Sequence, residues 1–177
     1  MIYRRNWETS LGFTLLELLI TIAVMAAILL AAAPSFSSLT TASQMTRLAD
    51  ELLGFMNQAK SEAVFRNQDL WAHINVATIP DDSGTWSITL TDSDAPGSGT
   101  ALLTMSGKPF TNIALEPVYS SEQVKFGGVR GKVKAGSMYF YPTEQTSKKL
   151  KLSTSYGASR ILVCGVGGDV YGYPECD

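Results

Sequence analysis

The chain has 177 residues, of which 45% are apolar, and its 14 Lys and Arg residues nearly balance its 16 Asp and Glu residues, for a net charge of −2. This length fits one domain, or one domain with an appendage, and the composition is too apolar and too weakly charged for a disordered chain. Because the chain has only 2 Cys and 1 His, a structural zinc site with about four such ligands is excluded, and we expect no metal and no cofactor.

The first predicted element is an apolar segment at residues 13–33. Of these 21 residues, 18 are apolar, the exceptions being Thr14, Glu17 and Thr21. A helix of this length reaches roughly 31 Å, enough to cross the hydrocarbon core of a bilayer. Arg4 and Arg5 precede the segment, and the positive-inside rule keeps them in the cytoplasm. The sequence therefore predicts a membrane-spanning helix over residues 13–34, with the following residues on the other side.

Three interpretations of this segment compete. A cleaved secretory signal fits the small residues 31–33, but Pro34 would then follow the cut bond, which is unfavourable because its ring fixes the backbone. Glu17 would also interrupt the apolar region. A plain membrane anchor explains the length but gives Glu17 no role, although an ionisable group costs roughly 2.5 to 3.5 kcal/mol at the centre of a membrane helix. The third interpretation rests on a resemblance.

The run GFTLLE at residues 12–17, followed by the long apolar segment, resembles the class III signal of type IV pilins and type II secretion pseudopilins. The resemblance implies that residues 1–12 are a leader, which a prepilin peptidase removes by cutting between Gly12 and Phe13. It also implies that the new amino group of Phe13 is N-methylated. The carboxylate of Glu17 would pair with the amino terminus of a neighbouring subunit. Two buried charges would then cancel only when subunits stack, which would favour the correct axial register.

A second helical pattern follows Pro34, at the start of a head that we expect to span residues 35–177. Charged residues separate apolar ones that recur at three- and four-residue intervals, namely Met45, Leu48, Leu52, Phe55, Met56, Ala59 and Ala63. We expect this apolar face to pack on the core of its own domain, the alternative being the groove of a partner. Because Asn67 tolerates the left-handed conformation that ends helices, one long helix is predicted from residue 13 to about residue 66.

Beyond Asn67 the apolar period changes to two, which is typical of strands. Alternation is clear at residues 70–76 and 86–90, and the other predicted strands are 102–105, 113–118, 124–126, 138–141, 150–152, 161–164 and 170–173. Clusters of Gly, Pro, Asp and Ser separate them. The sequence thus predicts an α+β fold in which a long amino-terminal helix packs on antiparallel β-sheets. With the helix end SEAVFRNQ at residues 61–68 and a strand containing Trp86, the pattern resembles the GspH/FimT/FimU class of minor pilins and pseudopilins, which is pilin-like in fold.

Cys164 and Cys176 are the only cysteines and lie near the carboxyl end. On the outward side of the membrane, in an oxidising periplasm, an even pair predicts a disulfide. In the chain-entropy model such a bond contributes roughly 3 kcal/mol, and here it would join the predicted strands 161–164 and 170–173. The alternative is a reactive thiol, against which we note that no histidine lies nearby in sequence.

The charges are unevenly distributed. From Asp50 to Glu122 there are 10 acidic residues against 3 basic ones, and from Lys125 to Arg160 there are 8 basic residues against 1 acidic one. The basic half is interleaved with tyrosines and could contact DNA or the acidic half of a neighbouring subunit. The candidate contact residues are Lys148, Lys149, Lys151 and Arg160.

Some relatives of FimT are DNA receptors for natural transformation, with a Gly-Arg-x-Arg motif near the carboxyl terminus. At the corresponding place this chain reads GDVY, at residues 168–171, and therefore lacks both arginines. This departure favours a subunit contact over DNA.

Catalytic motifs are absent from the sequence: there is no Gly-x-Ser-x-Gly elbow and no phosphate loop, and the single histidine, His73, lies in a predicted strand. We therefore expect no enzyme. The expected function is that of a FimU-like minor pilin that helps initiate assembly of a type IV pilus. The alternatives are a GspH-type pseudopilin of a type II secretion system and a FimT-like DNA receptor.

The partners implied by this interpretation are a prepilin peptidase, other minor and major pilins or pseudopilins, and the inner membrane, with DNA as the less favoured partner. The expected location is a single pass through the inner membrane with the head in the periplasm, and then the pilus or pseudopilus.

Overall fold

The computed structural model describes residues 12–177, except for the side chains of residues 31–35. The predicted leader therefore lies outside the described residues, apart from Gly12. Contacts divide the chain into two units, Met1–Thr40 and Thr41–Asp177. We call the described part of the first, residues 12–40, the amino-terminal unit, and the second the carboxyl-terminal unit.

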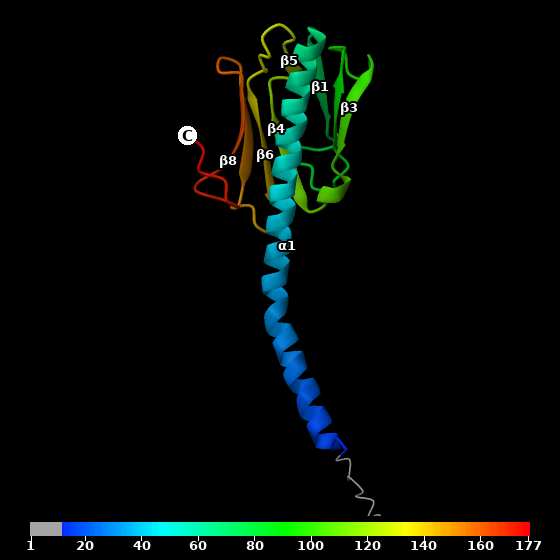
Figure 1. Ribbon diagram of the computed structural model, residues 1–177, viewed down its shortest axis with the longest axis vertical. Coiled ribbons are helices and arrows are strands. Elements are labelled where there is room, and N and C mark those ends of the chain that lie inside the picture. The colour runs from blue at the N-terminus through cyan, green and yellow to red at the C-terminus, as the bar shows by residue number, and fades with distance from the viewer. Residues whose placement is uncertain (1–11) are drawn as a thin grey trace, which may run out of the picture. The chain divides into compact units, whose positions relative to one another are not determined.

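One helix, α1 (Leu15–Arg66), begins in the first unit and ends in the second (Figure 1). At its start the hydroxyl of Thr14 accepts a hydrogen bond of 3.2 Å from the backbone N–H of Glu17. Thr14 thus acts as an N-cap, and together with Glu17 three residues later it has the sequence of a capping box. The cap satisfies one backbone donor that the first turn of the helix leaves without a partner.

The carboxyl end of α1 confirms the predicted helix stop. Asn67 has a φ of 50°, its N–H bonds to the carbonyl of Val64, and the N–H of Gln68 bonds to the carbonyl of Ala63. This pair of bonds is the Schellman motif, in which a residue in the left-handed region turns the chain out of the helix. The chain then enters the first strand directly.

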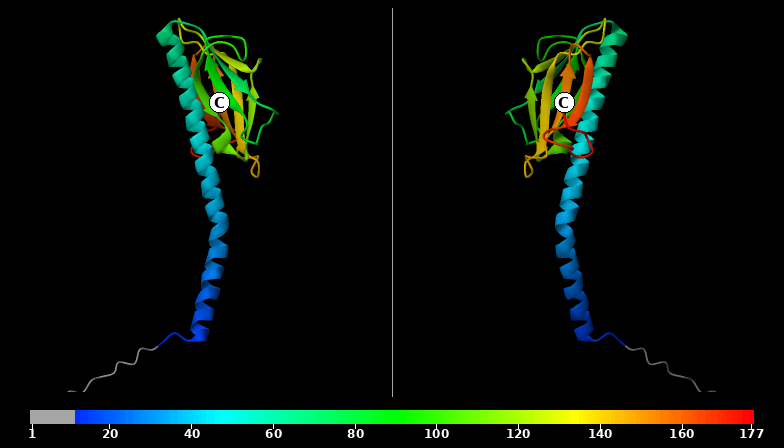
Figure 2. Two further views of the ribbon diagram at one scale, coloured as in Figure 1. Left: turned by 90° about the vertical axis from the view of Figure 1, so that its right-hand side faces the viewer. Right: turned by 90° about the vertical axis from the view of Figure 1, so that its left-hand side faces the viewer.

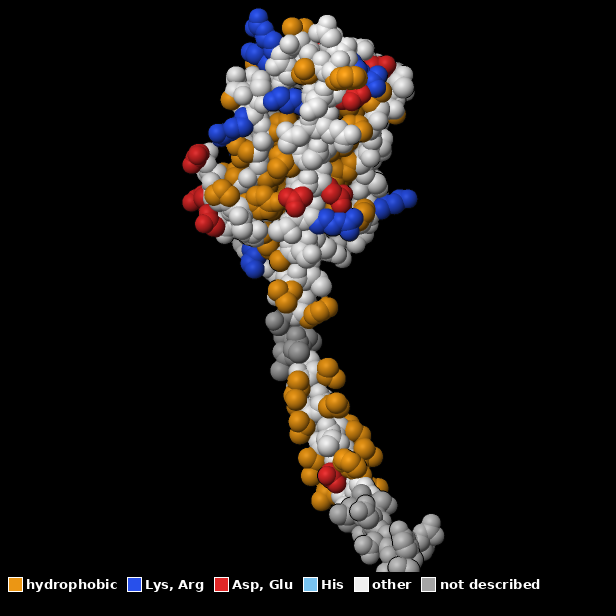
Figure 3. Space-filling view, viewed as in Figure 1, with side chains coloured by type: hydrophobic (Ala, Val, Ile, Leu, Met, Phe, Trp, Pro, Cys, Tyr) orange, Lys and Arg blue, Asp and Glu red, His pale blue; other side chains and the backbone are white. Residues whose placement is uncertain are grey.

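The amino-terminal unit leaves its large apolar side chains in solvent. They include Phe13, Leu19, Ile28, Leu30 and Leu39, each more than half exposed, and Figure 3 shows apolar side chains gathered along this part of the helix. Among the residues that the structure describes, none forms a helix long and apolar enough to cross a membrane. The membrane span over residues 13–34 stays a prediction.

Two four-stranded antiparallel sheets form the rest of the carboxyl-terminal unit. The first sheet has the order β3-β2-β1-β5, with bounds β1 Leu70–Asn75, β2 Ser87–Thr91, β3 Ala101–Ser106 and β5 Gln123–Phe126. The second has the order β4-β6-β7-β8, with bounds β4 Ile113–Val118, β6 Gly136–Pro142, β7 Leu150–Ser155 and β8 Arg160–Gly165. A short 3-10 helix, η1 (Lys108–Phe110), precedes β4.

The chain moves between the two sheets more than once. It completes β1, β2 and β3 in the first sheet, passes to the second for β4, returns to pair β5 with β1, and ends with β6, β7 and β8 in the second. The segments 119–122 and 127–135 make the last two crossings. The edge of the first sheet at β5 therefore lies at a seam where segments from both sheets meet.

One hydrophobic core joins α1 to the inner faces of both sheets. Figure 2 shows the carboxyl-terminal part of α1 along one side of the two sheets. The helix face predicted from the sequence is buried, as are the alternating residues of the sheets, for example Ala72, Ile88, Phe140 and Leu152. The structure thus confirms the predicted α+β fold, with a long helix packed on antiparallel sheets.

A buried tryptophan anchors one side of this core. The rings of Trp86 and Phe110 stack with centroids 6.3 Å apart and planes 12° from parallel. Gly107 lies against the ring of Trp86, so that a Cβ at this position would stand only 2.5 Å from the ring atoms. No residue with a side chain fits there without displacing the indole.

One predicted strand is wrong. Residues 170–173 form a tight turn in which the N–H of Val170 bonds to the carbonyl of Tyr173 and the reverse bond closes the pair. The two central residues, Tyr171 and Gly172, have φ values of 51° and 84°, the signs required by a type I′ turn. The alternating Val-Tyr-Gly-Tyr pattern resembles a strand, but the glycine allows the chain to reverse.

Candidate functional site

The residues of the predicted processing site lie just before the amino-terminal end of α1. Gly12 and Phe13 precede the helix and are exposed, with Phe13 77% accessible. Apart from its chain neighbours, no atom of the described residues lies within 4 Å of the position that a Cβ on Gly12 would occupy. The bond between them is sterically accessible to a protease. Cleavage at this bond and methylation of Phe13 remain predictions.

Glu17 lies in the first turn of α1, held in place by the Thr14 cap on its backbone. Its side chain is exposed, and within residues 12–177 no basic side chain pairs with it. A carboxylate at this end of a helix interacts favourably with the helix dipole. The backbone of Glu17 is therefore fixed and its carboxylate has no ion pair within the described residues, as the predicted contact with a neighbouring amino terminus requires.

The predicted disulfide is present. Cys164 of β8 and Cys176 are bonded at an S–S distance of 2.03 Å, with Cα atoms 5.0 Å apart. The bond does not join two strands as expected, because residues 170–173 form a turn. Instead it fastens residues 174–176 beside the end of β8, where the N–H of Gly165 bonds to the carbonyl of Pro174 and the N–H of Cys176 to the carbonyl of Gly165.

The carboxyl-terminal turn is also tied to α1. The hydroxyl of Tyr173 donates a hydrogen bond of 2.8 Å to a carboxylate oxygen of Asp50. Burial raises the pKa of Tyr173 to about 12, and the hydrogen bond to Asp50 and the negative charge of that carboxylate act in the same direction. Tyr173 therefore stays protonated and keeps donating over the physiological range.

The four basic residues singled out from the sequence do not form one cluster. Lys149 lies over the rings of Tyr139 and Tyr141, at 5.5 and 4.3 Å, and 3.6 Å from a carboxylate oxygen of Glu116. Lys151 lies over Tyr139 at 5.7 Å. These ammonium groups already occupy the aromatic faces that a stacked base would need.

Lys148 and Arg160 have further neighbours of their own. Lys148 precedes β7 and lies 6.0 Å from the ring centre of Tyr171. Arg160 begins β8 opposite Ser155, where it lines a groove with Lys151 and the carboxyl-terminal residues Glu175 and Asp177. Lys151 thus belongs to two surroundings, the tyrosine faces that it shares with Lys149 and the groove that it shares with Arg160, while Lys148 lies apart from both.

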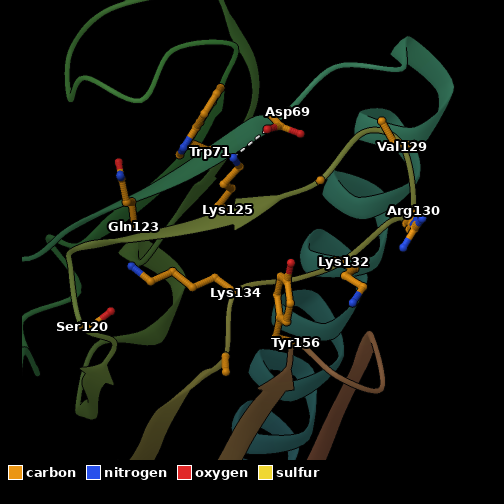
Figure 4. Close-up of a pocket in the computed structure, with 12 residues that line it drawn as sticks. Asp69, Trp71, Ser120, Gln123, Lys125, Val129, Arg130, Lys132, Lys134 and Tyr156 are labelled. Carbon is orange, nitrogen blue, oxygen red and sulfur yellow. Dashed lines mark ion pairs between the residues drawn. The ribbon is translucent and has the colours of Figure 1, made fainter.

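A different basic site, which the sequence did not single out, lies at the seam of the two sheets. It is a pocket of about 700 Å³ (Figure 4). Its lining comes from β1, β5, the crossing segments and the turn after β7: Asp69, Trp71, Ser120, Gln123, Lys125, Gly127, Val129, Arg130, Lys132, Lys134, Ala135 and Tyr156. Four cations and two aromatic rings thus surround one pocket.

The strand register explains how the pocket forms. Trp71 of β1 is paired with Lys125 of β5, and the ammonium of Lys125 lies 5.5 Å from the indole centre. Lys134 extends this row, because its N–H bonds to the carbonyl of Lys125. On the other side the ammonium of Lys132 lies 4.5 Å from the ring centre of Tyr156.

Only one acidic residue, Asp69, lines the pocket. Its carboxylate lies 2.6 Å from the ammonium of Lys125 and accepts a hydrogen bond from the N–H of Gly128. The hydrogen bond from Lys125, then that from Gly128, lowers the pKa of Asp69. Arg130, Lys132 and Lys134 have no carboxylate partner within residues 12–177, so the pocket carries an unbalanced positive charge.

This basic pocket was not predicted from the sequence, although the sequence contains one indication of it. Arg130, Lys132 and Lys134 alternate with small or apolar residues, which predicts three cations on one side of an extended segment. The contributions of Trp71 and Tyr156 could not be foreseen, because strand pairing and a turn bring them from distant parts of the chain.

Metal binding finds no support in the described residues, where no group of three or more His, Cys, Asp and Glu side chains could hold an ion. His73 is buried on β1, with its Nε2 2.9 Å from the carbonyl oxygen of Ser93 and 3.1 Å from the hydroxyl of Thr91. These contacts give the ring a structural place within the sheet.

Comparison with models of protein families shows the family to which the chain belongs. The family model described as type II transport protein GspH matches residues 48–160, so the chain belongs to the GspH family. It is therefore a minor pilin or pseudopilin of the GspH type, a structural subunit and not an enzyme. This confirms the class to which the sequence showed a resemblance.

Solved structures of two pilin-like proteins share the fold. The type IV minor pilin FimU of Pseudomonas aeruginosa strain PAO1 matches with a TM-score of 0.55 and 20% identity, over 68% of this chain and 88% of that one. The minor pseudopilin EpsH of the type 2 secretion system of Vibrio cholerae matches with a TM-score of 0.53 and 14% identity, over 69% and 97%. A search of curated proteins found no match. At these identities the likeness concerns the fold, which is pilin-like.

Proposed function

We propose that this protein is a FimU-like minor pilin that helps initiate assembly of a type IV pilus and is incorporated into it. In this proposal a prepilin peptidase cuts the Gly12–Phe13 bond at the inner membrane, and Phe13 becomes the methylated first residue. The carboxyl-terminal unit then lies in the periplasm until the subunit joins other minor and major pilins.

The observation that carries the proposal is the amino-terminal unit itself. Its helix has large apolar side chains exposed along its length and a carboxylate, Glu17, that no basic group neutralises within the described residues. A contiguous apolar surface of this kind needs lipid or other apolar helices to cover it. An unpaired carboxylate on such a surface favours a partner that supplies a positive charge.

Pairing with the amino group of a neighbouring Phe13 would meet both requirements at once. The neighbouring helix would cover the apolar side chains, and its amino terminus would neutralise Glu17. The Thr14 cap supports this arrangement because it fixes the first turn, and with it the place of Glu17 relative to residue 13. Assembly would then be coupled to the correct axial position of each subunit.

A GspH-type pseudopilin of a type II secretion system is the second candidate. The fold likeness to EpsH supports it in the same way as the likeness to FimU supports a pilus subunit. The two candidates share the chemistry at the amino terminus and differ in the machine that the subunit joins.

The discriminating experiment deletes the gene in its own host and measures two outputs from the same cultures. Pili sheared from the surface are quantified, and the secretion of a type II exoenzyme is measured in the medium. Loss of pili with normal secretion supports the proposal. Loss of secretion with normal pili supports the pseudopilin, and no change in either output refutes both.

Complementation with Glu17→Ala tests the assembly chemistry. We expect the variant to be cleaved at Gly12–Phe13 but to enter the sheared filaments at about one tenth of the normal level, because the unpaired amino group of its neighbour stays buried. Glu51→Ala is the matched control, since this glutamate is a partly exposed helix residue whose ion pair, among the described residues, is with Arg47 of the same chain. Normal incorporation of the Glu17→Ala variant would contradict the register argument.

A further inference from the structure

A second feature adjoins the basic pocket at the carboxyl end of α1. Three large apolar side chains lie in solvent there: Val64 and Phe65 of the last helical turn and Val129 of the 127–135 segment, which are 47%, 87% and 79% exposed. We call these three residues, together with Arg130, Lys132 and Lys134, the seam surface. The packing of Gly131 against Val64 brings the segment that carries Val129 to the end of α1, and exposed apolar side chains that lie near one another are typical of interaction sites.

The segment 127–131, which carries Val129 and Arg130, packs against the end of α1. A Cβ at Gly131 would lie 3.2 Å from both the Cε of Lys60 and a methyl carbon of Val64. Gly128 approaches so closely that a side chain there would collide with the backbone of Gln68. Figure 4 shows Val129 and Arg130 on this segment, beside the last turns of the helix.

The patch is also held in a fixed conformation. Gly131 has a φ of 58° and its N–H bonds to the carbonyl of Gly127, while the N–H of Gly128 bonds to Asp69. A surface that is already ordered loses little conformational entropy on binding. The exposed Val129 and Arg130 are therefore presented in a preformed geometry.

The chemistry of the patch defines its partner. Arg130, Lys132 and Lys134 lack carboxylate partners within the described residues, so the partner must supply negative charge. The neighbouring apolar side chains require an apolar contact from the same partner. A bare polyanion supplies the first but not the second, and the two aromatic rings of the pocket, those of Trp71 and Tyr156, already have lysine ammonium groups over them.

We propose that the seam surface is the docking site for an acidic, apolar-anchored segment of a neighbouring pilin subunit. An aromatic or aliphatic side chain of that segment contacts Phe65 and Val129, and its carboxylates pair with Arg130, Lys132 and Lys134. Apolar anchors surrounded by complementary charge are the usual composition of a protein interface. This inference rests on the proposed function, since it assigns a partner within the same assembly.

The first test places the photo-crosslinking residue p-benzoylphenylalanine at position 129 of the full-length chain, in cells that express the complete pilin operon. Position 118 is the matched control, because Val118 is also an exposed valine, 52% accessible, but lies at the end of β4. The expected result is a cross-link from position 129 to a peptide of another pilin-family subunit that contains at least two carboxylates. Position 118 should not give this product.

The second test reverses the charges. Arg130→Glu with Lys132→Glu should reduce the cross-linked product about tenfold, because like charges then face each other across the contact. Lys148→Glu with Arg160→Glu makes the same change in net charge outside the seam surface and should leave the product unchanged. In the Arg130→Glu, Lys132→Glu variant, changing the acidic residues of the cross-linked partner peptide to lysine should restore the cross-linked product.

Several outcomes would overturn the inference. These are no cross-link from position 129, a cross-link to lipid, nucleic acid or a protein outside the pilin family, or an equal loss in the control charge variant. The proposed function fails separately, when the wild-type chain is missing from sheared filaments and its deletion changes neither pili nor secretion. A wild-type chain found in filaments without the cross-link refutes only the docking site.

Discussion

The amino-terminal and carboxyl-terminal parts of α1 are built from the same kinds of apolar side chain but use them in opposite ways. Leu19 and Ile28 of the first unit are more than half exposed, whereas Leu48 and Leu52 of the second are completely buried against the sheets. The first part therefore adds almost nothing to the stability of the isolated chain. Its apolar surface becomes useful only when lipid or another subunit covers it, which is why intramolecular stability and assembly can change independently.

The largest expected difference in stability is between two variants, each with one leucine of α1 replaced by alanine. Leu52→Ala should lower the free energy of unfolding by about 3 kcal/mol, because it leaves a cavity in the core. Leu19→Ala should change it by less than about 0.5 kcal/mol, because its side chain is exposed. Urea unfolding of the full chain in detergent, followed by tryptophan fluorescence, to which the buried Trp86 contributes, measures both. Equal losses would show that the two parts do not differ as we describe.

The disulfide allows the stability of the carboxyl-terminal residues to be compared with that of the core of the same unit. Replacing Cys164 and Cys176 by serine should cost about 3 kcal/mol, since the bond closes a short loop in the unfolded chain. Hydrogen exchange at the amides of Gly165 and Cys176 should rise, because the bond holds residues 174–176 beside β8. Amides of α1 in the core should stay protected. If their protection fell as much, the disulfide would be needed for the whole unit.

A glycine beside the buried tryptophan tests how tightly the core is packed. Gly107→Ala should destabilise the unit by about 2 kcal/mol, because the new methyl group would overlap the ring of Trp86, which is itself stacked on Phe110. Gly157→Ala is the matched control, since no atom lies within 4 Å of its Cβ position. Thermal unfolding of both variants checks this prediction, and an unchanged midpoint for Gly107→Ala would refute it.

The smallest effect concerns the bond between the carboxyl-terminal turn and α1. Tyr173→Phe removes the hydrogen bond to Asp50 and should cost about 1 kcal/mol at neutral pH.

The raised pKa of Tyr173 also gives this bond a pH dependence. The folded state holds the phenol proton more tightly than the unfolded state, so the stabilisation is fully present below pH 10 and is lost as the pH rises to about 12. The variant should lose less stability than the wild type over this interval, as measured by urea unfolding at a series of pH values. Identical pH profiles would show that the bond is not formed.

Much of the local structure could be predicted because it depends on neighbouring residues. The three- and four-residue spacing identified the buried face of α1, and Asn67 marked its end because it adopts the left-handed conformation. The cysteine pair predicted its own bond. At residues 170–173 the same local reasoning failed, since a glycine at the second central position allows a turn whose alternation looks like a strand.

The candidate sites were harder to predict. Lys148, Lys149 and Lys151 are close in sequence, yet each contacts different residues from distant parts of the chain, such as Tyr171 for Lys148 and Glu116 for Lys149. The seam surface depends on the contact between Val64 and Gly131, which are 67 positions apart and meet only because the chain returns to the end of α1. Contacts of this kind follow from strand order, on which periodicity carries no information.

Strand β4 belongs to the second sheet, although it precedes β5 of the first sheet in the sequence. This order has a consequence for how the chain folds. Neither sheet corresponds to a continuous piece of sequence, so neither can finish folding before the other has begun. The hairpins β1–β2 and β6–β7 need only local contacts, but pairing Leu70 with Phe126 must close a long loop. We expect the formation of this β1–β5 pair to limit the folding rate, and a nick in the segment 119–122 to leave two fragments that cannot complete a sheet alone.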